Sequence, residues 1–177
     1  MLRLYPHRVR GEGHFVACLR RAGDAPASDL MKPAAERLSP PAPAVHAAYS
    51  AFAEPLRGLP AANAQLGDAL LCAPDLPPLD GVRVLRAGVQ LGALKGKVFA
   101  PDHALAMFHD LNPEAAPTAV LDREQALDYL RKRETDPALL SEGINRIACD
   151  GLTLGWIKRI GNRSNNLYPK ELRIATL

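Results

Sequence analysis

The sequence Cys149-Asp-Gly-Leu-Thr-Leu-Gly-Trp-Ile-Lys-Arg-Ile-Gly-Asn-Arg-Ser-Asn-Asn-Leu-Tyr-Pro-Lys-Glu-Leu-Arg173 decides how the C-terminal part of this chain folds. Asp150-Gly151 lies between two apolar runs. A two-residue type I′ turn requires positive φ at both central positions, and Asp-Gly is a preferred pair there. We therefore predict two paired strands, over residues 144–149 and 152–160, followed by a turn at Gly161-Asn162.

Several cations and one aromatic residue follow near the exit of the second predicted strand. Six residues are candidates for contacts with a polyanion: Lys158, Arg159, Arg163, Tyr168, Lys170 and Arg173. Cations interleaved with glycine and an aromatic ring let phosphates and bases approach the backbone closely. The alternative interpretation is a hairpin whose Trp156 fills a core and whose cations are only solvated, the usual fate of surface lysine and arginine.

The charge distribution favours the polyanion interpretation. The formal net charge is +3, but residues 1–21 hold five basic residues against one acidic, and residues 141–177 hold six against three. The residues between them carry more acidic than basic side chains. The chain thus has two basic ends and an acidic middle, a pattern that indicates an anionic partner at the ends.

The C-terminal segment also resembles a known family. Leu154-Gly-Trp-Ile-Lys-Arg and Asn166-Leu-Tyr-Pro-Lys-Glu-Leu-Arg173 are similar to the signature P-L-G-W-x-K, then L-K-N-H-Y-P-K-G-L-R, of RsmF-type RNA (cytosine-5) methyltransferases, which closes a PUA-like domain. The sequence departs from that signature at Thr153, Asn165 and Leu167, where the family has Pro, Lys and His. The resemblance implies that the chain binds RNA, but with two fewer cationic or titratable contacts than other members of the family make.

A second resemblance lies at the N-terminus. Arg3-Leu-Tyr-Pro-His-Arg-Val-Arg-Gly-Glu-Gly-His-Phe15 matches the R-L-x-P-H-x-x-x-G-E-G-H-F segment that ends the catalytic domain of the same family. From the residues alone we predict a turn at 11–13 and a strand over 14–19. A two-stranded piece of this kind is marginal in water unless it packs on something larger. The resemblance therefore implies an orphan β-hairpin whose catalytic domain is missing.

Catalysis by this chain alone is not expected. The catalytic cysteines of the family lie in motifs of the kind P-C-S-G and T-C-S, whereas Cys18, Cys72 and Cys149 have other neighbours. Gly11-Glu-Gly13 lacks the third glycine and the following helix of a dinucleotide fingerprint. We predict no catalytic residue and no cofactor in this chain. The S-adenosylmethionine that the resemblance implies belongs to the missing catalytic domain.

Composition excludes several classes of protein. With 47% apolar and 23% charged residues the chain is an ordinary globular protein, and no apolar run approaches the length of a membrane span. The N-terminus lacks the apolar core of a signal peptide, and three widely spaced cysteines indicate neither a disulfide framework nor a zinc site. His103 and His109, six residues apart on a predicted helix, do not share a face. We expect a cytoplasmic protein with no metal site and no membrane contact.

The middle of the chain predicts a linker followed by helices and strands. Residues 22–43 are rich in Pro and Ala without periodicity, which is typical of a flexible linker. After it we expect a helix over 45–56, a strand over 69–73 and a β segment with several glycines over 82–99. A helix that opens at Pro101 and a loop over 112–118 follow. A capping box at Asp122 and Gln125 then begins a helix that runs to 134. Four cations of the β segment either line an RNA-facing surface or are only solvated: Arg83, Arg86, Lys95 and Lys97.

We predict an α+β fold, with a PUA-like, strongly bent β barrel, flanking helices and the orphan hairpin before it. The expected parts are a terminal hairpin of a missing methyltransferase domain over 1–21, a linker over 22–43, an α+β segment over 44–115 and the PUA-like domain over 116–177. The resemblance implies that the chain grips structured RNA, ribosomal RNA in particular, for the catalytic methyltransferase domain. Two alternatives remain: a protein-interaction or structural module, and half of a split methyltransferase that is active only in trans.

Overall fold

The computed structural model describes residues 2–4, 14–16, 38–76 and 84–175. The chain divides into two compact units, Met1–Lys32 and Pro33–Leu177. In the first unit, β1 (Leu2–Leu4) pairs antiparallel with β2 (His14–Val16). This pairing agrees with the predicted hairpin, whose turn at 11–13 and whose end at 17–19 lie outside the described residues.

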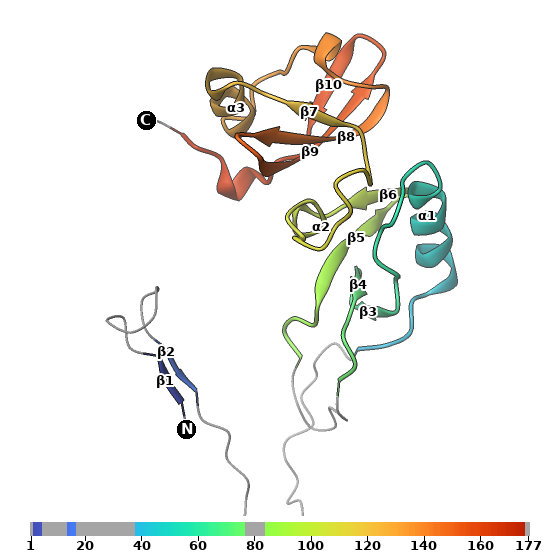
Figure 1. Ribbon diagram of the computed structural model, residues 1–177. Helices are drawn as coiled ribbons and strands as arrows, with labels where there is room; N and C mark the ends of the chain where they lie inside the picture. The colour runs from blue at the N-terminus through green and yellow to red at the C-terminus, as the bar shows by residue number, and fades with distance from the viewer. Residues whose placement is uncertain (1, 5–13, 17–37, 77–83, 176–177) are drawn as a thin grey trace, which may run out of the picture. The chain divides into compact units, whose positions relative to one another are not determined.

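The second unit begins with a helix and an antiparallel sheet, which we call the first sheet (Figure 1). Its elements are α1 (Pro43–Ala53), β3 (Ala64–Leu66), β4 (Ala69–Cys72), β5 (Val89–Lys95), β6 (Val98–Pro101) and the short helix α2 (His103–Ala106). The four strands pair in chain order. Ser39 exchanges two backbone hydrogen bonds with Gln65 of β3, so the last residues of the expected linker, from 38 on, join the folded unit.

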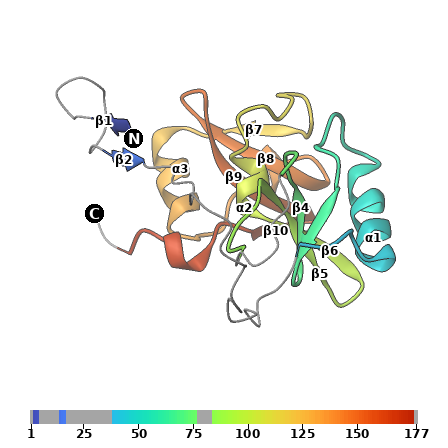
Figure 2. The same ribbon diagram turned by 90° about the horizontal axis from the view of Figure 1, so that it is seen from below.

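A second sheet follows, with the strand order β10-β9-β8-β7 (Figure 2). Its elements are β7 (Thr118–Val120), α3 (Arg123–Leu130), β8 (Gly143–Cys149), β9 (Leu152–Ile160) and β10 (Arg163–Asn166). β7 runs parallel to β8, and α3 lies in the crossover between them, whereas the other pairs are antiparallel. Asp150 and Gly151 adopt φ values of 49° and 77°, so the predicted β8–β9 hairpin with its type I′ turn is confirmed.

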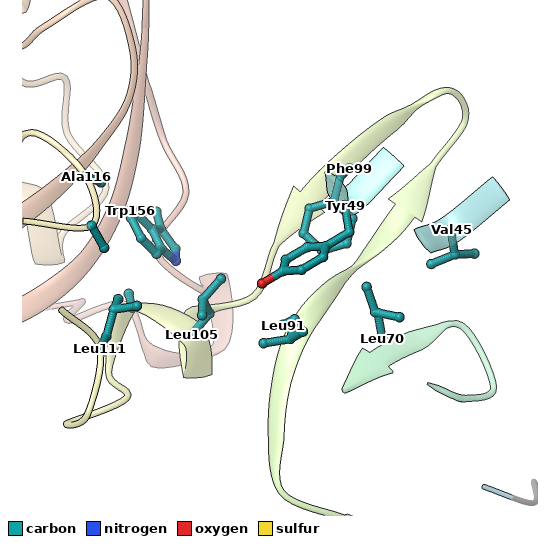
Figure 3. Packing of buried hydrophobic residues seen from close by; sticks show 11 residues of the cluster. Val45, Tyr49, Leu70, Leu91, Phe99, Leu105, Leu111, Ala116 and Trp156 are labelled. Atoms are coloured by element: carbon teal, nitrogen blue, oxygen red, sulfur yellow. The ribbon is translucent and has the colours of Figure 1, made fainter. Parts of the chain in front are cut away.

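Two main clusters of buried side chains stabilise this unit. The larger one joins the two sheets, because it contains Trp156 of β9, only 1% exposed, together with side chains of the first sheet, α1 and α2. Its other large members are Val45, Tyr49, Leu70, Leu91, Phe99, Leu105 and Leu111. Figure 3 shows Trp156 beside Leu105, Leu111 and Ala116. The smaller one lies between the second sheet and α3 and includes Leu121, Ala126, Tyr129, Ile147 and Ile157. Trp156 therefore fills a core, as the alternative interpretation of the hairpin expected for this residue.

The two helices after the first sheet differ in length from the prediction. Pro101 ends β6 instead of opening a helix, and α2 starts only after Asp102, whose carboxylate accepts the Ala104 N–H at 2.8 Å. α3 begins at the predicted capping box, with both reciprocal hydrogen bonds between Asp122 and Gln125 present. It ends at Leu130 and not at 134, because the chain turns at Lys132, where φ is 59°.

Three short strands were missed by the sequence analysis: β3, β7 and β10. The α+β class itself is confirmed. Within the described ranges, no helix is long and apolar enough to cross a membrane.

Candidate nucleic-acid interface

The two cations of the Lys-Arg pair on β9 lie on opposite faces of the second sheet, because successive side chains of a strand alternate. Lys158 shares its face with Trp156, two residues earlier. Along that face the side chains become more exposed toward the end of the strand, from buried Trp156 through half-buried Lys158 to Ile160, which is 58% exposed. The sequence prediction that grouped Lys158 with Arg159 therefore spans two different surfaces.

Arg163 of β10 joins Lys158 on one face. Asn165 pairs directly with Lys158, and Arg163 lies two residues before Asn165, so the two cations are diagonal neighbours across the β9–β10 pair. Diagonal neighbours have Cα atoms roughly 7–8 Å apart, within reach of long side chains. We call Lys158 and Arg163 the strand pair. Within the described ranges neither side chain forms an ion pair, and the exposed Arg163 faces solvent.

Arg159 is held by its own protein. Its guanidinium donates to the carbonyl oxygens of Leu140 at 2.6 Å and Gly161 at 2.9 Å, and Nε lies 3.7 Å from the Glu142 carboxylate. The Glu142 carboxylate also accepts the Gly161 N–H. Two of the five N–H donors of Arg159 thus fix the turn before β10 against the segment that leads into β8. We therefore expect Arg159 to contribute a local positive charge and not a bidentate contact with a phosphate.

Tyr168, predicted as a surface on which bases could stack, is partly buried by contacts within the protein. Its ring makes edge-type contacts with Tyr129 of α3, at 5.6 Å between centroids, and with His103 of α2, at 5.3 Å. Burial lowers the pKa of His103, against a smaller opposing effect of the Asp102 carboxylate. The half-buried Tyr168 joins α2 and α3, and only its outer part is open to a ligand.

The last two candidates lie on a short turn beside α3. Lys170 opens the 3-10 turn η2 (Lys170–Leu172), and Arg173 follows it; both are exposed. The Ile174 N–H donates to the Leu130 carbonyl at 3.2 Å and so ties this segment to the end of α3. Tyr168, Lys170 and Arg173 therefore form a separate C-terminal group.

A cation that the sequence analysis did not select lies next to this group. Lys132 donates from Nζ to the carbonyl oxygens of Asn166, at 2.9 Å, and Tyr168. Burial lowers the pKa of Lys132, and the charge of Lys170 lowers it further. Lys132 also adopts a positive φ of 59°, a backbone conformation that glycine adopts more readily than other residues.

The Leu-Gly-Trp sequence joins the two sheets. Gly155 adopts φ 149°, and a Cβ atom there would lie 2.5 Å from the Tyr129 hydroxyl oxygen. That hydroxyl donates to the Trp156 carbonyl at 3.0 Å, while the Trp156 indole N–H donates to the Asp102 carbonyl at 3.0 Å. The glycine thus lets Tyr129 approach β9, and the tryptophan fixes α2 against it.

A second junction is built on Arg146 of β8. Its guanidinium donates to Thr153 Oγ1 at 2.7 Å and to the carbonyl oxygens of Asn112 and Pro113 at 3.3 and 3.4 Å. Its buried Nε has no hydrogen-bond partner within the described residues. Arg146, counted in the sequence only as part of the basic end, thus holds the connection between the sheets.

Two glycines of the first sheet lie against the backbone of neighbouring strands. A Cβ atom at Gly88 would lie 2.1 Å from the Cys72 carbonyl oxygen, and one at Gly92 would lie 2.2 Å from that of Ala100. These two glycines therefore serve close strand packing. The described ranges contain no group of three potential metal ligands.

Comparison with known families assigns both halves of the second unit. Residues 51–108 match the family model described as RsmF rRNA methyltransferase first C-terminal domain. Residues 116–174 match the model described as methyltransferase RsmF PUA domain. The first match covers only the last three residues of α1, the first sheet and α2. The second covers the second sheet, α3 and the C-terminal group.

Proposed function

Because this chain belongs to the RsmF-type rRNA methyltransferase family and contains its first C-terminal domain followed by its PUA domain, we propose that it binds structured RNA and positions it for methylation. The observation that carries the proposal is the strand pair. Lys158 and Arg163 are presented on one face of a well-packed sheet and, within the described ranges, have no acidic partner. Free, neighbouring cations on a rigid element are what phosphate contacts require.

The binding mode we infer is electrostatic and dependent on shape. Double-stranded RNA is recognised mainly through phosphates, 2′-hydroxyls and helix shape, because its deep major groove is closed to side chains. Contacts from the strand pair and from Lys170 and Arg173 would release counterions, so affinity should fall steeply with salt. Structured ribosomal RNA is the substrate class that the family name supports.

Methyl transfer itself is assigned to a catalytic domain with its own S-adenosylmethionine site. The support for this is that the sequence contains neither a P-C-S-G nor a T-C-S motif. The chain's contribution to the reaction is then to hold the RNA while the other domain extrudes the target cytosine, a step that base-modifying enzymes require.

The test is a double charge reversal with a matched control. Lys158→Glu/Arg163→Glu is expected to weaken binding to a ribosomal RNA hairpin at least tenfold and to lower the salt slope, while leaving the melting temperature nearly unchanged. The control, Arg57→Glu/Arg123→Glu, changes the same charge at two exposed arginines on other surfaces. Equal losses in the two variants would show that only net charge matters and would reject the strand pair as the contact site.

A protein-interaction module predicts a different outcome. Its association with a partner would persist at high salt, and the chain would not be retained on ribosomal RNA. A split enzyme would restore methyl incorporation when the chain is mixed with a separately produced catalytic domain.

A further inference from the structure

A cleft of about 420 Å³ opens on the first C-terminal domain, between the strands β4 and β5 and the end of α2. This volume lies within the range of small-molecule sites in proteins. Apolar side chains form much of its wall, among them Leu71 of β4, Leu85, Met107 and Phe108. Leu85 is 76% and Met107 50% exposed, so these two do not serve the core of the domain.

Two polar side chains reach the same cleft. Gln90 of β5, the cross-strand partner of Leu71, lines it together with the exposed Arg86. Within the described ranges the Gln90 amide makes no hydrogen bond and the Arg86 guanidinium no ion pair. A side-chain amide offers two donor hydrogens and an acceptor oxygen, which can read a planar edge that carries both kinds of group.

The cleft carries little net charge. Its lining holds one arginine, Arg86, and one carboxylate, Asp102, which accepts the Ala104 N–H at the start of α2. His109 lies 2.9 Å from the Asp110 carboxylate. A space with apolar walls, an amide and a cation that has no ion pair among the described residues suits a neutral heteroaromatic ring that is attached to a phosphate.

We propose that this cleft takes one unstacked nucleobase of the bound RNA, with Gln90 on the edge of the base, Met107 and Phe108 against its faces and Arg86 on the adjoining phosphate. The proposal rests on the proposed function and extends it, because it makes the RNA ligand one with an unpaired or bulged nucleotide. Proteins commonly read RNA through such bases.

The cleft is fixed relative to the sheet that carries the strand pair. Asp102 lines the cleft, and its carbonyl oxygen accepts the Trp156 indole N–H. β9 continues from Trp156 to Lys158 in two residues. A phosphate contact at the strand pair and a base contact in the cleft can therefore be made by one rigid body, without a change in the angle between the domains.

The experiment compares two RNA hairpins that differ by one bulged 2-aminopurine. The wild-type chain is expected to bind the bulged hairpin about tenfold more tightly than the fully paired one and to change the 2-aminopurine fluorescence. Ala104→Trp, at an exposed position on the cleft wall, fills the space, and Gln90→Leu removes the amide. Both should abolish the preference and leave affinity for the paired hairpin unchanged. Ala47→Trp, on an exposed position of α1 that does not line the cleft, should retain the preference.

The outcomes separate the two proposals. Equal affinity of the wild type for the two hairpins, or a preference that survives in a folded Ala104→Trp or Gln90→Leu variant, overturns the base site and leaves the proposed function in place. Failure of the wild type to bind either hairpin overturns both.

Discussion

The indole Nε1–H of Trp156 donates a 3.0 Å hydrogen bond to the carbonyl oxygen of Asp102, and so joins β9 of the PUA domain to the start of α2 in the first C-terminal domain. Trp156→Phe would leave that carbonyl without its partner and create a gap in the larger core. We expect the free energy of unfolding to fall by about 2–3 kcal/mol, measured by urea denaturation. Tyr168→Phe is the control, since its hydroxyl makes no hydrogen bond within the described ranges; a loss for Trp156→Phe no larger than for this control would contradict the junction.

Gly155 is expected to be intolerant of a side chain for two reasons that can be separated. Gly155→Ala would place a methyl group 2.5 Å from the Tyr129 hydroxyl oxygen at a φ of 149°. Gly161→Ala has a positive φ but nothing within 4 Å, so it measures the backbone strain alone, about 1 kcal/mol. Gly155→Ala should cost several times more, and Tyr129→Phe should recover part of the loss in a double-mutant cycle. Additive effects would show that the hydroxyl is not what excludes the side chain.

Lys132 adopts an unfavourable backbone conformation, and its ammonium group forms two hydrogen bonds that offset the cost. Lys132→Ala keeps the φ of 59° and loses the Nζ contacts to the Asn166 and Tyr168 carbonyls. Lys132→Gly loses the same contacts but relieves the backbone. Thermal denaturation should therefore rank wild type above Lys132→Gly and Lys132→Gly above Lys132→Ala, with the two variants about 1 kcal/mol apart. The reverse order of the two variants would mean that the positive φ costs little here.

Arg159 and Lys158 are neighbours in sequence but should behave differently. Arg159→Gln would break the hydrogen bond to the Leu140 carbonyl and lower stability by about 1–2 kcal/mol, with a small effect on the salt dependence of RNA binding. Lys158→Gln should reduce the salt slope by about 0.7–0.9 and leave stability almost unchanged. Urea denaturation and binding titrations at several salt concentrations measure both quantities. If Arg159→Gln lowered the slope as much as Lys158→Gln, Arg159 would be a phosphate contact despite its internal partners.

The free energy of unfolding should fall at alkaline pH because of a tyrosine in the larger core. Burial raises the pKa of Tyr49 to about 12, with a smaller contribution from Cys72, and its hydroxyl donates to the Pro60 carbonyl at 2.6 Å. Because an unfolded tyrosine ionises near pH 10, this contribution is complete below about pH 10 and is lost as the pH rises toward 12. Denaturation curves between pH 9 and 12 should show less pH dependence for Tyr49→Phe than for wild type; identical slopes would exclude Tyr49 as a cause.

Elements with strong local signals were predictable. The Asp150-Gly151 turn and the Asp122/Gln125 capping box are decided by a few adjacent residues, and the structure has both. β10 has no such signal, since Arg163-Ser-Asn-Asn is polar. Contacts distant in sequence stabilise it instead: Ser164 donates to the Thr135 carbonyl at 2.7 Å, and Asn166 donates to the Tyr129 carbonyl at 2.8 Å.

The sequence was enough to name the candidate residues of the interface. It was not enough to show which of them share one surface. The charge pattern identified the basic C-terminal end, and Lys158 was among the candidates. Without β10, its register against β9 was unknown, so the pairing of Lys158 with Arg163 was hidden. The capture of Arg159 by a carbonyl 19 residues away has no local signature either. The cleft lined by Gln90 depends on α2 packing against β5, which periodicity cannot show.

Trp156 also has a consequence for how the two halves can be inherited or dissected. It is carried by the PUA domain, yet most of its neighbours in the larger core belong to the preceding domain. A cut between residues 108 and 116 would remove Trp156 from the core of the N-terminal fragment. In the C-terminal fragment the same indole would be exposed to solvent. We therefore expect the two modules to unfold as a single cooperative unit, and a chimera that exchanges one of them would need side chains that complement Trp156.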